Sequence, residues 1–168
     1  MLTVCIAGKN EIAINGLNYL IKKYKNKIKI CALPNPEDSG IDTWKKSFRK
    51  FCLKKNVKIT NLSKLYKIKK LLFLSLEYSK IIDTDKFISN QLFNIHFSLL
   101  PKHRGMYTSV WPILNGDKYA GTTLHVLDKS IDGGNIISQK KFKISDTITS
   151  RTLYKKHMNN AFLLFKKN

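Results

Sequence analysis

The chain has 168 residues, of which 31 are Lys or Arg and 11 are Asp or Glu, so its formal net charge is +20. Hydrophobic residues make up 43%, enough for a core, which excludes a disordered polycation, and the length suits one domain over residues 1–168. No apolar run approaches the roughly 18 residues of a membrane-spanning helix, and the apolar start, residues 1–7, lacks the basic leader of a signal peptide. The three cysteines are odd in number and lie in apolar surroundings, which favours a reducing cytoplasm over a disulfide framework.

The first half of the chain alternates between strand and helix patterns. The apolar run LTVCIA, stopped by Gly8, is typical of a buried parallel strand. In chain order the sequence predicts a strand at 2–7, a helix capped by Asn10 and ending at 24, a strand at 27–33, a turn at 34–40, a helix at 41–55, and strands at 57–60 and 71–76. Such alternation predicts a Rossmann-like α/β fold with an open, mostly parallel twisted sheet flanked by helices.

The second half continues with strands predicted at 91–97, 121–127 and 136–144 and a final helix at 149–165. Leu153, His157, Ala161 and Leu164 form one apolar stripe on that helix. On the helix at 41–55, one face is expected to consist of Trp44, Phe48, Phe51 and Cys52.

The basic charge is concentrated at the two ends of the chain. Residues 1–84 carry 18 basic and 6 acidic groups, residues 85–139 carry 5 and 4, and residues 140–168 carry 8 and 1. Only 3 of the basic residues are Arg, the side chain that reads phosphates and bases with a bidentate fork. We therefore expect solvated lysine-rich faces and no nucleic-acid partner, with a basic nucleic-acid-binding domain as the alternative.

Three places in the chain have residues suited to chemistry. Gly8-Lys9-Asn10 follows the first strand, where open α/β sheets bind ligands and where a helix amino terminus favours an anion. Asn94 and His96 share one side of a strand, and together they can stabilise an oxyanion.

The third place is the run from His125 to Gly134. Its glycines allow the chain to fold back, so Asp128 or Asp132 can approach His96, raise its pKa and relay a proton. The alternative is a metal held by His96, His103, His125 and the two Asp residues. No HxxxH, HExxH or CxxC spacing supports it, so we expect no metal.

The middle of the chain carries a collinear set of motifs. They are NIHFSLLP at 94–101, RG at 104–105, ILNG at 113–116, GTTLH at 121–125, IDGG at 131–134 and II at 136–137. Together they resemble the formyltransferase family, whose members use N10-formyltetrahydrofolate to formylate an amine. The resemblance implies the formyltransferase fold, a folate co-substrate and a one-carbon group transferase.

The resemblance also assigns roles by position. Asn94 and protonated His96 would hold the oxyanion of a tetrahedral intermediate, and Asp132 would orient His96 and move protons from the attacking amine towards N10. Segments similar to the family's folate pocket supply Ser75, Leu76, Glu77, Tyr78, Ile81, Asp128 and Ile131.

The stretch KHRGMYTSVWPI at 102–113 looks most like the branch that acts on nucleotide-linked amino sugars. It implies N-formylation of a dTDP-linked amino-dideoxyhexose, 4-amino rather than 3-amino, in surface polysaccharide (O-antigen, lipopolysaccharide) synthesis. The alternative acceptors are methionyl-tRNA and glycinamide ribonucleotide. The expected substrate contacts are Gly8, Lys9, Asn10, His103, Arg104, Met106, Tyr107 and Trp111.

Among these contacts, Tyr107 and Trp111 would stack on a base or sugar, and Lys9 and Arg104 would neutralise a pyrophosphate. Met106 and Trp111 also suit a helix packing face. Members of the sugar branch usually continue past the last helix with strands that help form a dimer. We therefore expect a cytoplasmic homodimer without membrane contact if the chain extends beyond residue 168.

Overall fold

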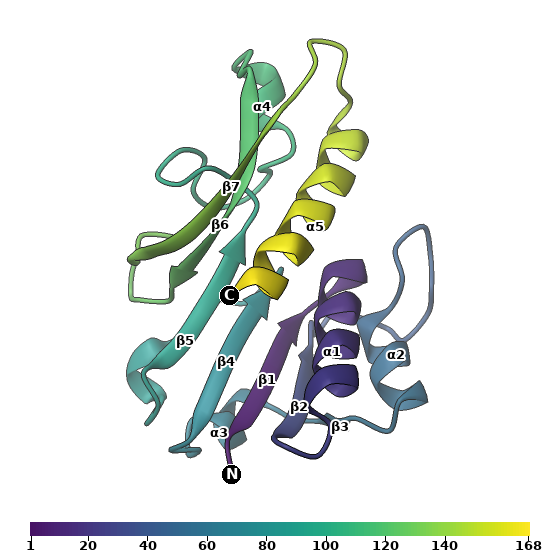
Figure 1. Ribbon diagram of the computed structural model, residues 1–168, viewed down its shortest axis with the longest axis vertical. Coiled ribbons are helices and arrows are strands. Elements are labelled where there is room, and N and C mark those ends of the chain that lie inside the picture. The colour runs from purple at the N-terminus through teal and green to yellow at the C-terminus, as the bar shows by residue number, and fades with distance from the viewer. The chain divides into compact units, whose positions relative to one another are not determined.

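The computed structural model describes all residues, 1–168, and they form two compact units, Met1–Phe93 and Asn94–Asn168. The elements in chain order are shown in Figure 1: β1 (Thr3–Gly8), α1 (Asn10–Tyr24), β2 (Lys29–Pro34), α2 (Phe48–Lys54), β3 (Lys58–Ile59), α3 (Leu62–Leu65), β4 (Leu71–Leu76), the 3-10 helix η1 (Thr84–Lys86), β5 (Gln91–His96), α4 (Trp111–Leu114), β6 (Tyr119–Val126), β7 (Ile136–Lys143) and α5 (Ser150–Lys167). The strand order is β3-β2-β1-β4-β5-β6-β7, and β5 crosses the boundary between the units. This is the mostly parallel α/β sheet that the sequence predicts.

In the first unit, β1 is the central parallel strand. It pairs with β2 on one side and with β4 on the other, so that Cys5 lies opposite Cys31 and Phe73. The Cys5 and Cys31 thiols are buried and free, as the cysteine pattern predicts. Helix α1 packs against β1 and α2, and it buries Ile12 and Leu17 completely.

The turn from β1 to α1 differs from the prediction in one detail. Asn10 does not cap α1: it is the first residue of the helix, Lys9 occupies the cap position, and no side chain caps the helix there. Asn10 has a left-handed φ of 58°, which Asn tolerates better than most residues, and its amide donates to Glu77 Oε2 at 3.3 Å. At Gly8, a β-carbon would collide with the carbonyl oxygen of Leu76, so only glycine allows this close approach of β1 to the end of β4.

Helix α2 is half as long as the sequence predicts, since it begins at Phe48 and not at residue 41. The cause is Asp38, whose carboxylate accepts hydrogen bonds from the Gly40 N–H, the Ser47 hydroxyl and the Arg49 N–H. Ser47 then caps α2 by accepting from the Lys50 N–H at 3.0 Å. Residues 41–47 therefore form a loop, and Trp44 lies in it, 59% exposed, instead of sharing a helix face with Phe48 and Cys52.

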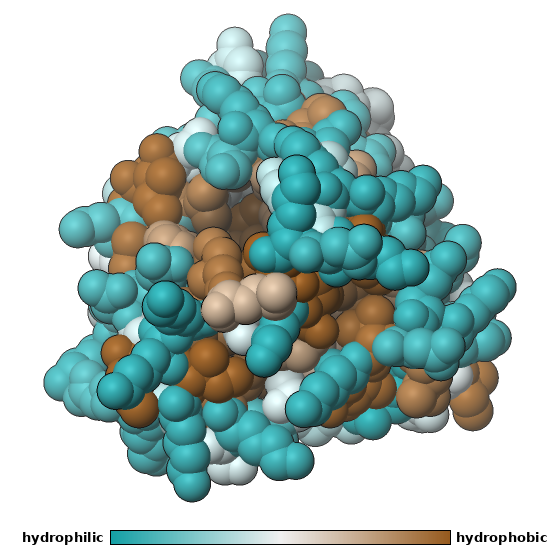
Figure 2. Space-filling model, turned by 60° about the horizontal axis from the view of Figure 1, so that its bottom comes forward, coloured by the Kyte–Doolittle hydropathy of each residue, from teal (hydrophilic) through white to brown (hydrophobic).

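In the second unit, β6 and β7 form an antiparallel pair, with a register irregularity between Leu124 and His125. Helix α5 packs on both strands, and its predicted stripe is confirmed, because Leu153, His157, Ala161 and Leu164 are all buried. The face drawn in Figure 2 carries many hydrophilic side chains, as the lysine content leads one to expect, with hydrophobic patches between them. None of the helices combines the length and the apolar character needed to cross a membrane.

Candidate active site

The second unit brings together the three side chains that the sequence nominates for catalysis. Asn94 and His96 lie on β5, where the two-residue repeat of a strand points them to one side, and Asp132 lies on the loop after β6. Asn94 Nδ2 donates to Asp132 Oδ1 at 3.2 Å, and His96 Nδ1 lies 3.4 Å from Asp132 Oδ2. One carboxylate thus contacts both an amide and an imidazole.

Asp132 is held in an unusual backbone conformation. Its φ of 48° is left-handed, and the Gly105 N–H donates to its Oδ2 at 2.9 Å. Burial by itself would raise the pKa of the Asp132 carboxyl, but the neighbouring His125 and His96 rings and the Gly105 N–H hold this pKa below its usual value. Asp132 is therefore an anion at neutral pH.

The imidazole of His96 is 8% exposed and has acceptors facing both nitrogens. The carbonyl oxygen of His103 lies 2.8 Å from Nε2, and because a carbonyl only accepts, Nε2 carries the hydrogen. Burial lowers the pKa of His96 and outweighs the nearby Asp132 charge, which raises it. In the neutral ring the Nδ1 lone pair then faces Asp132, so a proton that arrives at Nδ1 is shared with a carboxylate.

His125 is a fourth member of this group. Its Nε2 lies 3.1 Å from Asn94 Nδ2 and 3.5 Å from Asp132 Oδ1, and its Nδ1 lies 2.9 Å from the Val126 carbonyl oxygen. The sequence pointed to His125 only as a metal ligand. The signal that could have indicated a role in catalysis is its position on β6, just before the loop that carries Asp132. No group of three or more His, Cys, Asp or Glu side chains is placed to hold a metal ion.

The predicted substrate contacts in the second unit follow β5. The His103 ring is engaged by Asp117, with Nε2 and Oδ2 2.6 Å apart. Met106, Tyr107 and Trp111 are 72%, 68% and 44% exposed, and the Trp111 indole N–H donates to the Met106 carbonyl. Arg104 is also exposed. Apart from His103, these side chains are open to solvent, as a ligand contact requires.

The residues predicted for folate binding divide between the units: Ser75, Leu76, Glu77, Tyr78 and Ile81 belong to the first, and Asp128 and Ile131 to the second. Ser75 and Leu76 are buried in β4, so they can offer a ligand little besides backbone groups. Ile81 and Ile131 are exposed, and the Asp128 carboxylate accepts from the Ser130 N–H and hydroxyl.

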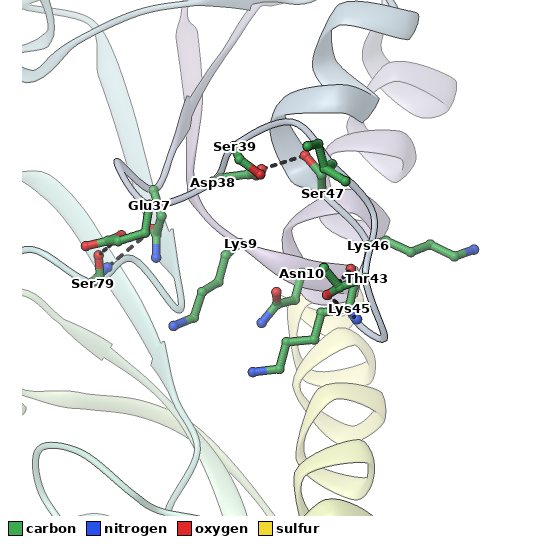
Figure 3. Close-up of a pocket in the computed structure, with 12 residues that line it drawn as sticks. Lys9, Asn10, Glu37, Asp38, Ser39, Thr43, Lys45, Lys46, Ser47 and Ser79 are labelled. Atoms are coloured by element: carbon green, nitrogen blue, oxygen red, sulfur yellow. Dashed lines mark hydrogen bonds between the residues drawn. The ribbon is translucent and has the colours of Figure 1, made fainter.

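The first unit has a pocket of about 420 Å³ at the ends of β1 and β2. Its lining residues are Lys9, Asn10, Asn35, Glu37, Asp38, Ser39, Ile41, Thr43, Lys45, Lys46, Ser47 and Ser79. Lys9 and Asn10 were predicted from the sequence, and Figure 3 shows Lys45 extending on the same side as both, whereas Lys46 points away. The contribution of Lys45 was missed because residues 41–47 were expected to be helical.

Three comparisons relate the chain to known proteins. The sequence pattern of the family described as formyl transferase matches residues 21–164. A solved structure of WlaRD, a sugar 3N-formyl transferase, in the presence of dTDP and 5-N-formyl-THF has a TM-score of 0.94 and 46% identity, over 100% of this chain and 61% of that one. The N-formyltransferase from Helicobacter canadensis, in complex with folinic acid and dTDP-3-aminofucose, also has a TM-score of 0.94, with 43% identity over 100% of this chain and 62% of that one.

A more distant relative is the methionyl-tRNA formyltransferase of Clostridium tetani. It is 28% identical over 173 residues, which cover 96% of this chain and 56% of the relative. The chain thus spans less than two thirds of the length of each of these three proteins.

Proposed function

Because the chain belongs to the formyl transferase family, we propose that the protein transfers a formyl group from N10-formyltetrahydrofolate to the amine of a dTDP-linked amino sugar. The observation that carries the proposal is the contact of Asp132 with both Asn94 and His96. A carboxylate that lies 3.2 Å from an amide donor and 3.4 Å from an imidazole suits acyl transfer, in which an oxyanion forms and a proton moves.

In the proposed reaction the acceptor amine attacks the formyl carbon, a C–N bond forms, and the carbonyl oxygen becomes an oxyanion. Asn94 Nδ2 has two hydrogens, and in this structure His125 and Asp132 lie within hydrogen-bond distance of it. The formyl oxygen takes the place of one of these partners. Once its ring has gained a proton, His96 stabilises the same oxygen through its positive charge, since its two N–H groups face the His103 carbonyl and Asp132.

The proton balance of the reaction is even, because the amine loses one proton and N10 of the folate gains one as its bond to the formyl carbon breaks. Asp132 is an anion beside the free lone pair of His96 Nδ1, so a proton released by the amine can be held between them. It then passes to N10, directly or through water. Asp132 thereby acts as the proton carrier and keeps the His96 ring in place.

The acceptor is proposed from a different set of observations. The pocket of the first unit presents Lys9 and Lys45 beside Asn10, and two ammonium groups suit the diphosphate of a nucleotide sugar. The solved relative with 46% identity is a sugar 3N-formyl transferase in the presence of dTDP, and the one with 43% identity is in complex with dTDP-3-aminofucose. We therefore propose a dTDP-linked 3-amino-dideoxyhexose, and the 4-amino position expected from the sequence is tested beside it.

Several further expectations belong to the same proposal. They are a cytoplasmic enzyme, a homodimer formed by the longer protein, and a role in surface polysaccharide synthesis. They are supported by the resemblance to the sugar branch of the family. The alternative acceptor, methionyl-tRNA, is favoured by the Clostridium tetani relative.

The test is a panel of acceptors with one formyl donor. Purified protein is given N10-formyltetrahydrofolate with dTDP-3-amino, dTDP-4-amino and UDP-amino sugars, glycinamide ribonucleotide or methionyl-tRNA, and release of tetrahydrofolate is followed by absorbance. We expect release only with a dTDP-amino sugar and a formylated product by mass spectrometry. Release with methionyl-tRNA alone would replace the proposed acceptor. Tight, steeply salt-dependent tRNA binding without any release would favour the nucleic-acid alternative.

A further inference from the structure

The loop that follows β5 contacts both ionisable members of the catalytic group through its backbone. The His103 carbonyl oxygen accepts the hydrogen of His96 Nε2 at 2.8 Å, and the Gly105 N–H donates to Asp132 Oδ2 at 2.9 Å. These two peptide groups determine which nitrogen of His96 carries its hydrogen and where the Asp132 carboxylate lies.

The His103 side chain fixes the conformation of this loop. Its Nε2 lies 2.6 Å from Asp117 Oδ2, and the two side chains are 13% and 17% exposed. Asp117 follows α4, and Lys102 Nζ lies 3.6 Å from its other oxygen. The hydrogen bond with the His103 side chain is the main influence that holds the pKa of the Asp117 carboxyl below its ordinary value.

The backbone of His103 is left-handed, with φ of 54°, a conformation that a non-glycine residue keeps only when its surroundings fix it. The contact with Asp117 is a short, largely shielded and charge-assisted bond, which is the strong kind of hydrogen bond. The Ser98 hydroxyl adds a second restraint by donating to the Lys102 carbonyl at 2.7 Å. The side chain of His103 is therefore committed to Asp117, and its carbonyl is aimed at His96.

We propose that Asp117 and His103 form a positioning pair that sets the tautomer of His96 and the proton affinity of its Nδ1. The inference rests on the proposed function for its catalytic meaning, and it gives His103 a role other than the substrate contact expected from the sequence. With the pair intact, the His103 carbonyl keeps hydrogen on Nε2 and leaves Nδ1 to face Asp132. Without the pair, the His103 carbonyl moves away from His96 Nε2. The hydrogen of the neutral His96 ring can then move to Nδ1, where it blocks proton uptake by that nitrogen.

The test reads His96 directly. In the full chain labelled with ¹⁵N-histidine, long-range ¹H–¹⁵N spectra report which ring nitrogen carries hydrogen across a pH series. The titratable groups around His96 are Asp132, His103, His125 and, on α5, His157, so each histidine is assigned with a single variant. In the unaltered chain we expect neutral His96 to carry its hydrogen on Nε2.

In Asp117→Ala we expect a mixture of the two tautomers, a displaced titration midpoint for His96, and a kcat lowered roughly tenfold or more with little change in KM, since misplacement of a catalytic group costs rate. Asp117→Asn keeps an oxygen acceptor for His103 and should restore the Nε2–H form. Asp146→Asn, at an exposed carboxylate on the loop before α5, is the matched control and should leave His96 unchanged.

A folded Asp117→Ala variant with an unaltered His96 tautomer and midpoint would overturn the inference, whatever its activity. If Asp117→Ala does not fold, His103→Asn replaces it, because Asn tolerates the left-handed backbone but does not reach Asp117. For this variant too, a mixture of His96 tautomers is the expected result, and an unaltered tautomer and midpoint would overturn the inference. A changed His96 spectrum in a protein that formylates no acceptor would refute the proposed function and leave the positioning pair standing.

Discussion

His125 Nε2 lies 3.1 Å from Asn94 Nδ2, and the Val126 carbonyl oxygen lies 2.9 Å from the opposite nitrogen of the same ring. Because the carbonyl accepts, Nδ1 carries the hydrogen and Nε2 of the neutral ring accepts from Asn94. His125 is 1% exposed, so this contact fixes which way the Asn94 amide points. Its nitrogen is thereby turned towards Asp132.

His125→Leu should leave the Asn94 amide free to rotate. We expect kcat to fall roughly tenfold with little change in KM, since a buried hydrogen bond and the orientation it gives are lost. His125→Gln can still accept a hydrogen bond and should recover part of the loss. Steady-state kinetics and a thermal melt of each variant check this. Equal rates for folded His125→Leu and the parent protein would contradict the assignment.

Asp132→Asn tests the proton carrier. The amide preserves size and removes the charge, so we expect the fold to persist and kcat to fall by roughly 10²–10⁴, the usual worth of general acid–base catalysis. The exposed Asp146→Asn serves as the comparison and should match the parent protein. Single-turnover formyl transfer is the measurement. An Asp132→Asn rate equal to that of Asp146→Asn would remove Asp132 from the mechanism.

The pocket of the first unit offers a matched pair of lysines. Lys45 and Lys46 both line it, but in Figure 3 only Lys45 extends to the side of Lys9. Lys45→Ala should weaken dTDP binding roughly tenfold, since a hydrogen bond to a charged group contributes about 1.5–3 kcal/mol. Lys46→Ala should bind dTDP like the parent protein, as titration calorimetry would reveal. Equal losses at the two positions would indicate a general effect of charge.

His157 gives the stability of the protein a pH dependence. Its ring is fully buried on α5 and stacks on Phe97 with 5.4 Å between centroids. Burial lowers the pKa of His157 to about 3. The unfolded chain, with an ordinary pKa of about 6.5, therefore binds the proton first as the pH falls.

Above pH 6.5, His157 is neutral in both the folded and the unfolded chain and does not affect stability. As the pH falls from about 6.5 to about 3, the free energy of unfolding decreases by on the order of 5 kcal/mol in total. His157→Phe retains an aromatic ring and does not titrate, so its free energy of unfolding should fall less between pH 7 and pH 4. Urea melts at the two pH values measure this. At pH 8 both proteins are neutral at this position, which provides the internal control. Parallel losses in both proteins would show that His157 is not responsible.

The sequence was sufficient to predict an element where its residue pattern is compatible with only one kind of structure. The apolar runs that became β1 and β4 and the stripe of α5 were predicted because burial demands them. Asn94, His96 and Asp132 were found through spacing and resemblance, and they do meet. The predicted helix at 41–55 was wrong in its first half because Asp38 binds the backbone across the loop, and periodicity contains no sign of such a bond.

His103 shows a second kind of limit. Its residue type suits a ligand contact, and only the structure reveals that its ring is bound by Asp117, 14 positions later. Asn10 is similar, because Asn is a common helix cap and here instead holds Glu77. In both cases a partner distant in the sequence decided what the side chain does.

Because of the hydrogen bonds of Asp38, selection can change the loop that lines the pocket of the first unit without changing the formyl-transfer residues. The carboxylate holds Gly40 at one end of the loop and Ser47 and Arg49 at the other. With both ends held, residues of this loop other than Asp42, whose carboxylate accepts from the Ser47 N–H at 2.9 Å, can be replaced without moving β2 or α2. Under the proposed function, a lineage can change through this loop how the diphosphate is held, while Asn94, His96 and Asp132 are inherited unchanged.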